Sequence, residues 1–409
     1  MTVTAPVANL LFDSVSRNTG DIAIGVAAEQ LFAARGLTSR IANPFDEAFP
    51  SPLIIGGGEL IRTKGDDFYD AYRQRGGHIL NAAGVWSSAD DLGYLKDYSY
   101  VSARSEHEVD VLRSFVPDAD VLPCATTLLQ SDHFEIPGIE PGETVVGIHM
   151  VPHSLRLIED LIPIIDAIPH KKVFIPFTHY NGDESFMNTL PFNRENSIVL
   201  DRLDPLQLHS VIRQMDYVVV SSLHASIYAY SQNIPFASIH QKKAEYYFQD
   251  RALGSHLVRD DRELVAMLSR LDSETFDFSE QISLDVRRVN QAFDHYANIL
   301  GATEPQFVPP SDPAPSARQQ AVLFDQAQKV ISDRDLALAY SESRRLESRK
   351  IVLGLQQRTT ILSEALIASR TAQEAAQAEL ERRDQQLTNR FYRRVRRELR
   401  RFASVFKRS

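Results

Sequence analysis

Residues 217–240 read YVVVSSLHASIYAYSQNIPFASIH. The apolar run at 217–220 predicts a buried strand, residues 223–233 a helix, and residues 234–240 a second strand. A strand, a helix and a strand at this spacing indicate a parallel βαβ unit. The alternation continues outward from this unit, with strands predicted at 144–151 and 171–178 and helices at 154–168, 203–215 and 242–254.

The N-terminal part of the chain repeats this pattern. Strands are predicted at 8–13, 51–61 and 77–86, a helix at 22–36, and a further strand and helix within 98–116. We therefore expect an α/β fold with two doubly wound lobes, residues 1–140 and 141–300. Gly and Pro in the segment 138–143 suit a hinge between them.

Beyond these lobes the composition changes. The segment 301–315 holds five prolines and predicts a stiff linker. Residues 316–409 contain no proline and a single glycine, Gly354. This composition predicts one long helix or a helical hairpin. Leucines at irregular coiled-coil spacing predict that residues 316–390 form a homo-oligomer; they are Leu355, Leu362, Leu366, Leu380 and Leu387.

The end of this arm is basic and amphipathic. Apolar residues recur on one helical face, at Phe391, Val395, Leu399, Phe402 and Phe406. Arginines occupy the other faces. We expect residues 390–408 to lie on an anionic membrane surface, and the alternative is that this helix packs on its own partner helix.

Overall composition limits the function classes. The 409 residues carry a net charge of −10 although the C-terminal end is basic, so the body is acidic and we expect no nucleic-acid partner. Cys124 is the only cysteine, which excludes an internal disulfide and fits the cytoplasm. With no signal peptide and no run of about 18 apolar residues, any membrane contact would be peripheral, at the inner face.

Two loops of the N-terminal lobe are candidates for binding. Asn18-Thr19-Gly20-Asp21 joins the first strand to the first helix, where backbone amides attract anions. The alternative is ordinary helix capping. Gly56-Gly57-Gly58 ends an apolar strand and would leave its amides unshielded, or would simply allow a sharp corner.

In the C-terminal lobe, Ser221, Ser222 and His224 follow the strand at 217–220. His224 could hydrogen-bond an oxyanion or move a proton near neutral pH, and the two serines add hydroxyl donors. The alternative is a pair of capping serines beside a packed histidine.

Cationic residues follow two other strands. Lys242 and Lys243, next to His240, suit a phosphate or carboxylate clamp, and so does Arg104. The pairs His149 with His153 and His179 with Asp183 lack a convincing third ligand, so we expect no metal site.

Taken in order, these motifs resemble those of the polysaccharide pyruvyl transferase family across roughly residues 8–300. The matching segments are Asn18–Asp21, Leu53–Gly58, Arg104-Ser105, Leu223-His224-Ala225 followed by Pro235, and Lys242 or Lys243. The resemblance implies two facing Rossmann-like lobes of the glycosyltransferase-B type. It also implies pyruvyl transfer from phosphoenolpyruvate, the donor substrate, to two hydroxyls of a glycan, with no cofactor.

The resemblance also implies residue roles. His224 would transfer a proton or contact phosphate, and the donor would be held by Arg104 with Lys242 or Lys243. From their position after the strand, we also expect Ser221 and Ser222 to contact the donor. The Asn18 loop and the glycines at 56–58 would line the acceptor side. The sequence departs from the family where Ser222 replaces an arginine and where Pro123-Cys124-Ala125-Thr126 replaces an aspartate-proline pair.

Two other functions remain open. A glycosyltransferase that uses a nucleotide sugar would share this architecture, but no acidic residue at a strand end of the second lobe clearly matches a ribose. The other is a non-catalytic scaffold whose helical arm carries the function. It remains an alternative because Ser222 replaces an arginine of the family.

Overall fold

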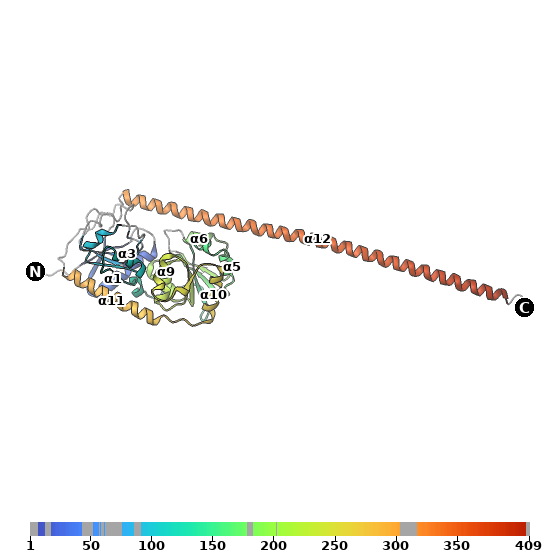
Figure 1. Ribbon diagram of the computed structural model, residues 1–409, viewed down its shortest axis with the longest axis horizontal. Coiled ribbons are helices and arrows are strands. Elements are labelled where there is room, and N and C mark those ends of the chain that lie inside the picture. Colours follow the sequence, from blue (N-terminus) through green and yellow to red (C-terminus); the bar gives the residue numbers. More distant parts are fainter. Residues whose placement is uncertain are drawn as a thin grey trace. The chain divides into compact units, whose positions relative to one another are not determined.

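The computed structural model describes residues 7–12, 18–42, 52–56, 58, 61, 76–85, 91–177, 183–201, 203–302 and 317–405. It contains two parallel sheets of six strands each (Figure 1). We call the N-terminal lobe the part built on the first sheet and the C-terminal lobe the part built on the second.

The sheet of the N-terminal lobe has the strand order β2-β1-β3-β4-β5-β6. Its strands are β1 (Val7–Leu11), β2 (Thr38–Ile41), β3 (Leu53–Gly56), β4 (Ile79–Ala83), β5 (Tyr100–Ala103) and β6 (Asp120–Val121). The helices are α1 (Thr19–Ala33) and α3 (Glu106–Arg113), with short 3-10 turns at Gly93–Asp97 and Ala125–Leu128. Every residue of β3 and β4 is buried, as expected of central strands with both faces covered.

The sheet of the C-terminal lobe has the order β12-β11-β10-β7-β8-β9, which is the Rossmann order. Its strands are β7 (Val145–His149), β8 (Lys171–Phe174), β9 (Ser197–Val199), β10 (Tyr217–Val220), β11 (Phe236–Ile239) and β12 (Leu257–Val258). Its helices are α4 (Ser154–Leu157), α5 (Leu161–Asp166), α6 (Asp183–Thr189), α7 (Pro205–Arg213), α8 (Leu223–Ser231), α9 (Lys242–Gln249), α10 (Asp261–Ser273) and α11 (Ser279–Gly301). The expected fold class, with two doubly wound lobes, is confirmed.

One predicted helix is wrong in its extent. Residues 154–168 form two short helices, α4 and α5, with extended backbone at Ile158. Pro163 explains the break. Its ring clashes with the carbonyl four residues earlier, and it has no backbone N–H to donate to that carbonyl. That carbonyl, on Glu159, accepts a hydrogen bond from the Tyr340 hydroxyl instead, at 3.4 Å.

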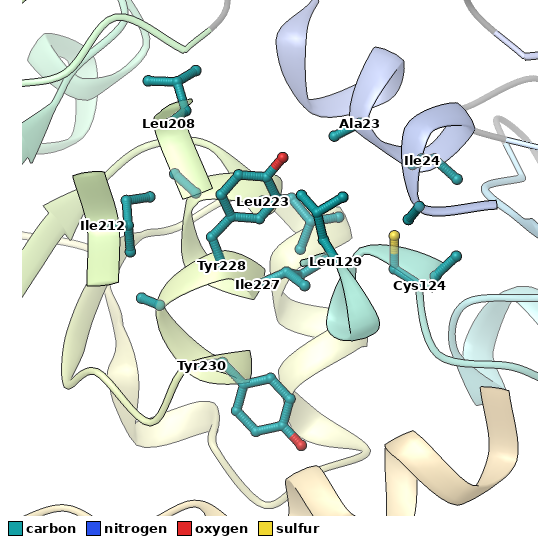
Figure 2. Close-up of a cluster of buried hydrophobic side chains, with 14 of the residues drawn as sticks. Ala23, Ile24, Cys124, Leu129, Leu208, Ile212, Leu223, Ile227, Tyr228 and Tyr230 are labelled. Carbon is teal, nitrogen blue, oxygen red and sulfur yellow. The ribbon is translucent and has the colours of Figure 1, made fainter. Parts of the chain in front are cut away.

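The two lobes share one hydrophobic core. Figure 2 shows Ala23 and Ile24 of α1 in the same cluster as Leu223 and Ile227 of α8. Helix α11 adds a second connection, because it leaves the C-terminal lobe and packs Phe293 on Phe32 of α1, with ring centroids 5.0 Å apart. The loops at the strand ends of the two lobes are therefore held in contact.

The arm is a single helix, α12 (Ala317–Val405). Ala337 is fully buried against the C-terminal lobe, and Tyr340 packs beside it. Residues 342–409 form a separate unit. In the described part of the chain, no helix combines the length and the apolar character that a membrane span requires.

Candidate functional site between the lobes

Ligands of doubly wound sheets bind at the carboxyl ends of strands, where the strand order reverses. In the N-terminal lobe this reversal lies between β1 and β3, and in the C-terminal lobe between β7 and β10. The segments that follow β1 and β10 carry Asn18–Asp21 and Ser221–His224. Both sets were singled out by the sequence motifs, and the fold brings part of each together.

His224 of α8 lies directly against the start of α1. A Cβ atom placed on Gly20 would be 2.5 Å from His224 Nδ1, so only glycine allows this approach of the two helices. His224 Nδ1 lies 3.5 Å from Asp21 Oδ1. Asn18 holds the same carboxylate, because its Nδ2 donates to Asp21 Oδ2 at 2.6 Å.

Of the three glycines at 56–58, Gly58 approaches the same carboxylate. Gly58 has a φ of +58°, which favours glycine, and a Cβ there would lie 2.9 Å from Asp21 Oδ2. Gly56 instead packs against Phe12 and Asn81. Gly57 lies outside the described residues.

Cys124, which lies in the segment where the sequence departs from the family and was not among the predicted site residues, contacts the other side of the imidazole. Its Sγ lies 3.8 Å from His224 Nε2 and 3.1 Å from Thr126 Oγ1. Burial raises the pKa of the Cys124 thiol, so the sulfur keeps its proton and can donate it to Nε2. Because Nδ1 faces the Asp21 carboxylate, which can only accept a hydrogen bond, we assign the imidazole proton to Nδ1 and the acceptor role to Nε2.

The imidazole of His224 is neutral in this setting. Burial, followed by the positive charges of Arg104 and Lys243, lowers the pKa of His224 to about 3. The side chain is 8% exposed. A neutral, buried imidazole can accept or pass on a proton but does not add a positive charge for phosphate binding.

Arg104, after β5, is also buried. Its Nε and Nη2 donate to Glu108 Oε1 at 3.1 and 2.9 Å, and Ser105 Oγ donates to Glu108 Oε2 at 2.8 Å. Its guanidinium packs on Gly84, where a Cβ atom would overlap Nη2. The positive charge of Arg104 is therefore largely balanced by Glu108, which the sequence motifs did not single out.

The two serines differ in their surroundings. Ser221 Oγ hydrogen-bonds Ser154 Oγ at 2.5 Å inside the C-terminal lobe, and its carbonyl accepts from Gln241 Nε2. Ser222 is the N-cap of α8, yet its side chain makes no capping hydrogen bond. Ser221 thus supports the loop, while Ser222 occupies the helix start beside His224.

Lys242 and Lys243 form the first turn of α9. Lys242 is exposed and Lys243 half-buried, and neither makes a hydrogen bond or ion pair with any residue in the described ranges. Because Lys243 contributes to the lowered pKa of His224, its ammonium acts on the site electrostatically. His240, before this helix, is paired with Glu245 at 2.9 Å.

The histidines considered for a metal have other partners. His149 Nε2 lies 3.0 Å from Asp183 Oδ2, and His153 Nε2 lies 3.0 Å from the carbonyl of His240. His179 lies outside the described residues. Within the described ranges, no three side chains of His, Cys, Asp or Glu gather as a metal site would require.

Comparisons with known proteins give one family. The family model described as polysaccharide pyruvyl transferase matches residues 18–243. A putative UDP-N-acetylglucosamine 2-epimerase from Listeria monocytogenes is similar in structure, with a TM-score of 0.47 and 12% identity over 75% of this chain and 100% of that chain. The glycosyltransferase SnogD from Streptomyces nogalater has a TM-score of 0.40 and 10% identity over 74% and 97%. A search of curated proteins finds no significant match.

Proposed function

Because the chain belongs to the polysaccharide pyruvyl transferase family, we propose that it moves a pyruvyl group from phosphoenolpyruvate to two hydroxyls of a cell-surface polysaccharide or of its lipid-linked precursor. The observation that carries this proposal is the contact of His224 with Gly20 and Asp21. This contact joins one motif from each lobe, and both motifs lie within the matched residues.

The proposed reaction needs a proton and a way to release phosphate. Protonation of the enol carbon makes the neighbouring carbon oxocarbenium-like, and a sugar hydroxyl adds there and loses its proton. The bond to the phosphate oxygen then breaks, and phosphate leaves with its electron pair. A second hydroxyl closes the ketal and gives up its proton, so that one proton is taken up on carbon and two are released from the hydroxyls.

Residue roles follow from the charges around the site. His224, as a neutral imidazole oriented by Asp21, is proposed to accept the proton that the attacking sugar hydroxyl loses. Lys243, with Lys242 beside it, is proposed to bind the anionic donor in place of the arginine that Ser222 replaces. Arg104 is proposed to contact the donor while Glu108 fixes its orientation. Asn18 and the glycines at 56–58 are proposed to face the acceptor.

The test is phosphate release from phosphoenolpyruvate in the presence of a cell-wall glycan extract. Wild-type protein should release phosphate, and His224→Gln should not. Lys243→Gln should raise the KM for phosphoenolpyruvate by about tenfold or more, because losing one charged contact costs about 1.4 kcal/mol or more. Lys242→Gln is the matched control and should change the KM less, since of the two lysines Lys243 is the one that contributes to the lowered pKa of His224.

Other outcomes would favour the alternatives. Binding of a nucleotide sugar without phosphate release would point to a glycosyltransferase. A protein that neither releases phosphate nor binds nucleotides would be a scaffold, with the family fold kept for its shape.

We further propose that the arm brings the enzyme to lipid-linked acceptors at the inner face of the membrane. Phe391 and Tyr392 on α12 are about two-thirds exposed, at 65% and 67%, among arginines. Leu399 and Phe402 lie where side chains are not described, and Phe406 lies outside the described residues. Truncation after Asn389 should abolish co-sedimentation with anionic vesicles, and equal sedimentation of both proteins would contradict the membrane proposal.

A further inference from the structure

A cleft lies at the edge of the N-terminal lobe, and His224 is not among its lining residues. It has a volume of about 410 Å³ and runs between β6, the edge strand of the sheet, and α11. Tyr100, Asp120 and Leu122 line one side, and Arg288 and His295 line the other. None of these residues belongs to the family motifs.

The polar groups of this cleft are arranged for a ligand with many hydroxyls. Arg288, Gln291 and His295 project from successive turns of α11 at spacings of three and four, so they share one face. All three are exposed, and Arg288 and Gln291 make no hydrogen bond or ion pair within the described part of the chain. Their donors and acceptors are therefore open to a ligand.

Hydrogen bonds hold the polar groups of the opposite wall in place. The Tyr100 hydroxyl donates to Asp120 Oδ2 at 3.0 Å, and burial together with Asp120 raises the pKa of Tyr100, so the hydroxyl keeps its proton. The other oxygen of Asp120 accepts from the Val121 amide at 2.8 Å. The Tyr100 and His295 rings meet edge to face with centroids 5.4 Å apart, and they offer aromatic surface to the C–H face of a sugar.

The charges in the cleft argue against other ligand classes. Glu106 is paired with Arg113 at 3.2 Å, so Asp120 and Arg288 leave one charge of each sign and offer a phosphate or nucleotide no surplus of positive charge. An extended peptide adds to an edge strand through free amides, but the amide of Val121 is already taken by Asp120. A neutral ligand with alternating donors and acceptors fits the lining best.

We propose that this cleft binds a neutral saccharide unit of the acceptor chain, outside the site where the pyruvyl group is transferred. The proposal rests on the proposed function for the identity of the acceptor. Glu106, at the rim of the cleft, follows Arg104 by two residues, a chain distance of at most about 7 Å. The cleft therefore lies beside the segment that carries Arg104, and in this proposal it holds the polymer while the reacting unit lies near His224.

Saturation-transfer NMR on the full-length protein tests the cleft without needing activity. The probes are the methyl glycosides of glucose, galactose, mannose and N-acetylglucosamine. At least one should receive saturation from the wild-type protein and equally from His224→Gln. The double variant Arg288→Ala with Gln291→Ala should bind it about tenfold more weakly or not at all.

The matched control removes the same residue types from the same helix. Arg287→Ala with Gln281→Ala lies on α11 outside the cleft lining and should bind as the wild type does. The proposal is overturned if none of the glycosides binds, or if binding is lost in His224→Gln but kept in the cleft variant. Saccharide binding in the cleft without phosphate release from phosphoenolpyruvate would support the cleft proposal and contradict the proposed function.

Discussion

Arg104 and Glu108 form a buried ion pair one helical turn apart, with Arg104 Nη2 2.9 Å from Glu108 Oε1 and side-chain exposures of 6% and 4%. Arg104 directly follows β5, and Glu108 lies in the first turn of α3. A guanidinium buried without a carboxylate would be strongly unfavourable. Glu108 therefore allows a cation to be placed next to the candidate active site.

The first prediction concerns this pair. Glu108→Gln should lower the free energy of unfolding by about 3 kcal/mol, because it leaves the Arg104 charge without its partner. Urea unfolding measures this change. Asp110→Asn, which removes a carboxylate from the exposed Arg113 on the same helix, is the control and should change stability little. Equal effects of the two variants would mean that Glu108 does not compensate a buried charge.

The central strands were predictable because their apolar runs are bounded by turns, as at Leu53–Gly56 and Tyr217–Val220. Strands such as β6 and β12, which have two residues each, carry too little pattern to be recognised. The order of the motifs indicated the family, which the family model confirms.

The contacts within the site were not predictable from the sequence in the same way. Cys124 and His224 are 100 residues apart and meet only because both lobes turn their strand ends inward. The sequence of the Ser221-Ser222 pair does not indicate that Ser221 hydrogen-bonds Ser154. Such pairings depend on side-chain direction in three dimensions, which local spacing does not encode.

The second prediction concerns the tautomer of His224. In Asp21→Asn, the new amide should keep its oxygen toward Asn18 Nδ2, which donates at that position, and should turn its NH₂ group toward His224 Nδ1. An NH₂ donor requires an unprotonated Nδ1, so the proton should move to Nε2. Pyruvyl transfer should fall about a hundredfold or more.

Long-range proton–nitrogen NMR correlations distinguish the two tautomers, and His224→Gln identifies the signals. The wild type should show a protonated Nδ1 and Asp21→Asn a protonated Nε2. The same tautomer in both proteins would show that Asp21 does not orient the ring. Because this measurement needs no substrate, it is independent of the proposed reaction.

The third prediction is an acid-dependent loss of stability at His209. Burial, and then the charge of Arg213, lowers the pKa of His209 from 6.5 to about 4. Below pH 6.5 the unfolded chain binds a proton at His209 that the folded chain does not, so stability falls as the pH drops from about 6.5 to about 4. Above pH 6.5 the residue makes no pH-dependent contribution.

Urea unfolding of the wild type and His209→Gln across this range measures the effect. Between pH 6.5 and 4, the free energy of unfolding of the wild type should fall more steeply than that of the variant, by up to about 1.4 kcal/mol per pH unit. Above pH 7 the two proteins should show parallel pH dependence. If the unfolding free energies of the two proteins also changed in parallel through the acid range, the pKa of His209 would not be lowered in the folded protein.

The fourth prediction concerns self-association through α12. Leu355, Leu362, Leu366, Leu380 and Leu387 occupy a or d positions of one heptad register that has no leucine between Leu366 and Leu380. Leu362 and Leu366 are 70% and 72% exposed. A helix with such exposed leucines gains stability by packing them, and a second copy of the same helix offers a matching seam. Sedimentation velocity of the full-length protein should therefore show an oligomer.

Leu362→Lys with Leu366→Lys should convert this oligomer to a monomer, because each copy would bring two charges into the seam. Leu353→Lys with Ile367→Lys is the matched control, since these apolar residues are also exposed but occupy a different heptad position. The control should sediment as the wild type does. A monomeric wild type, or dissociation of both double variants alike, would rule out the leucine seam as the interface, since charge on either face would then act equally.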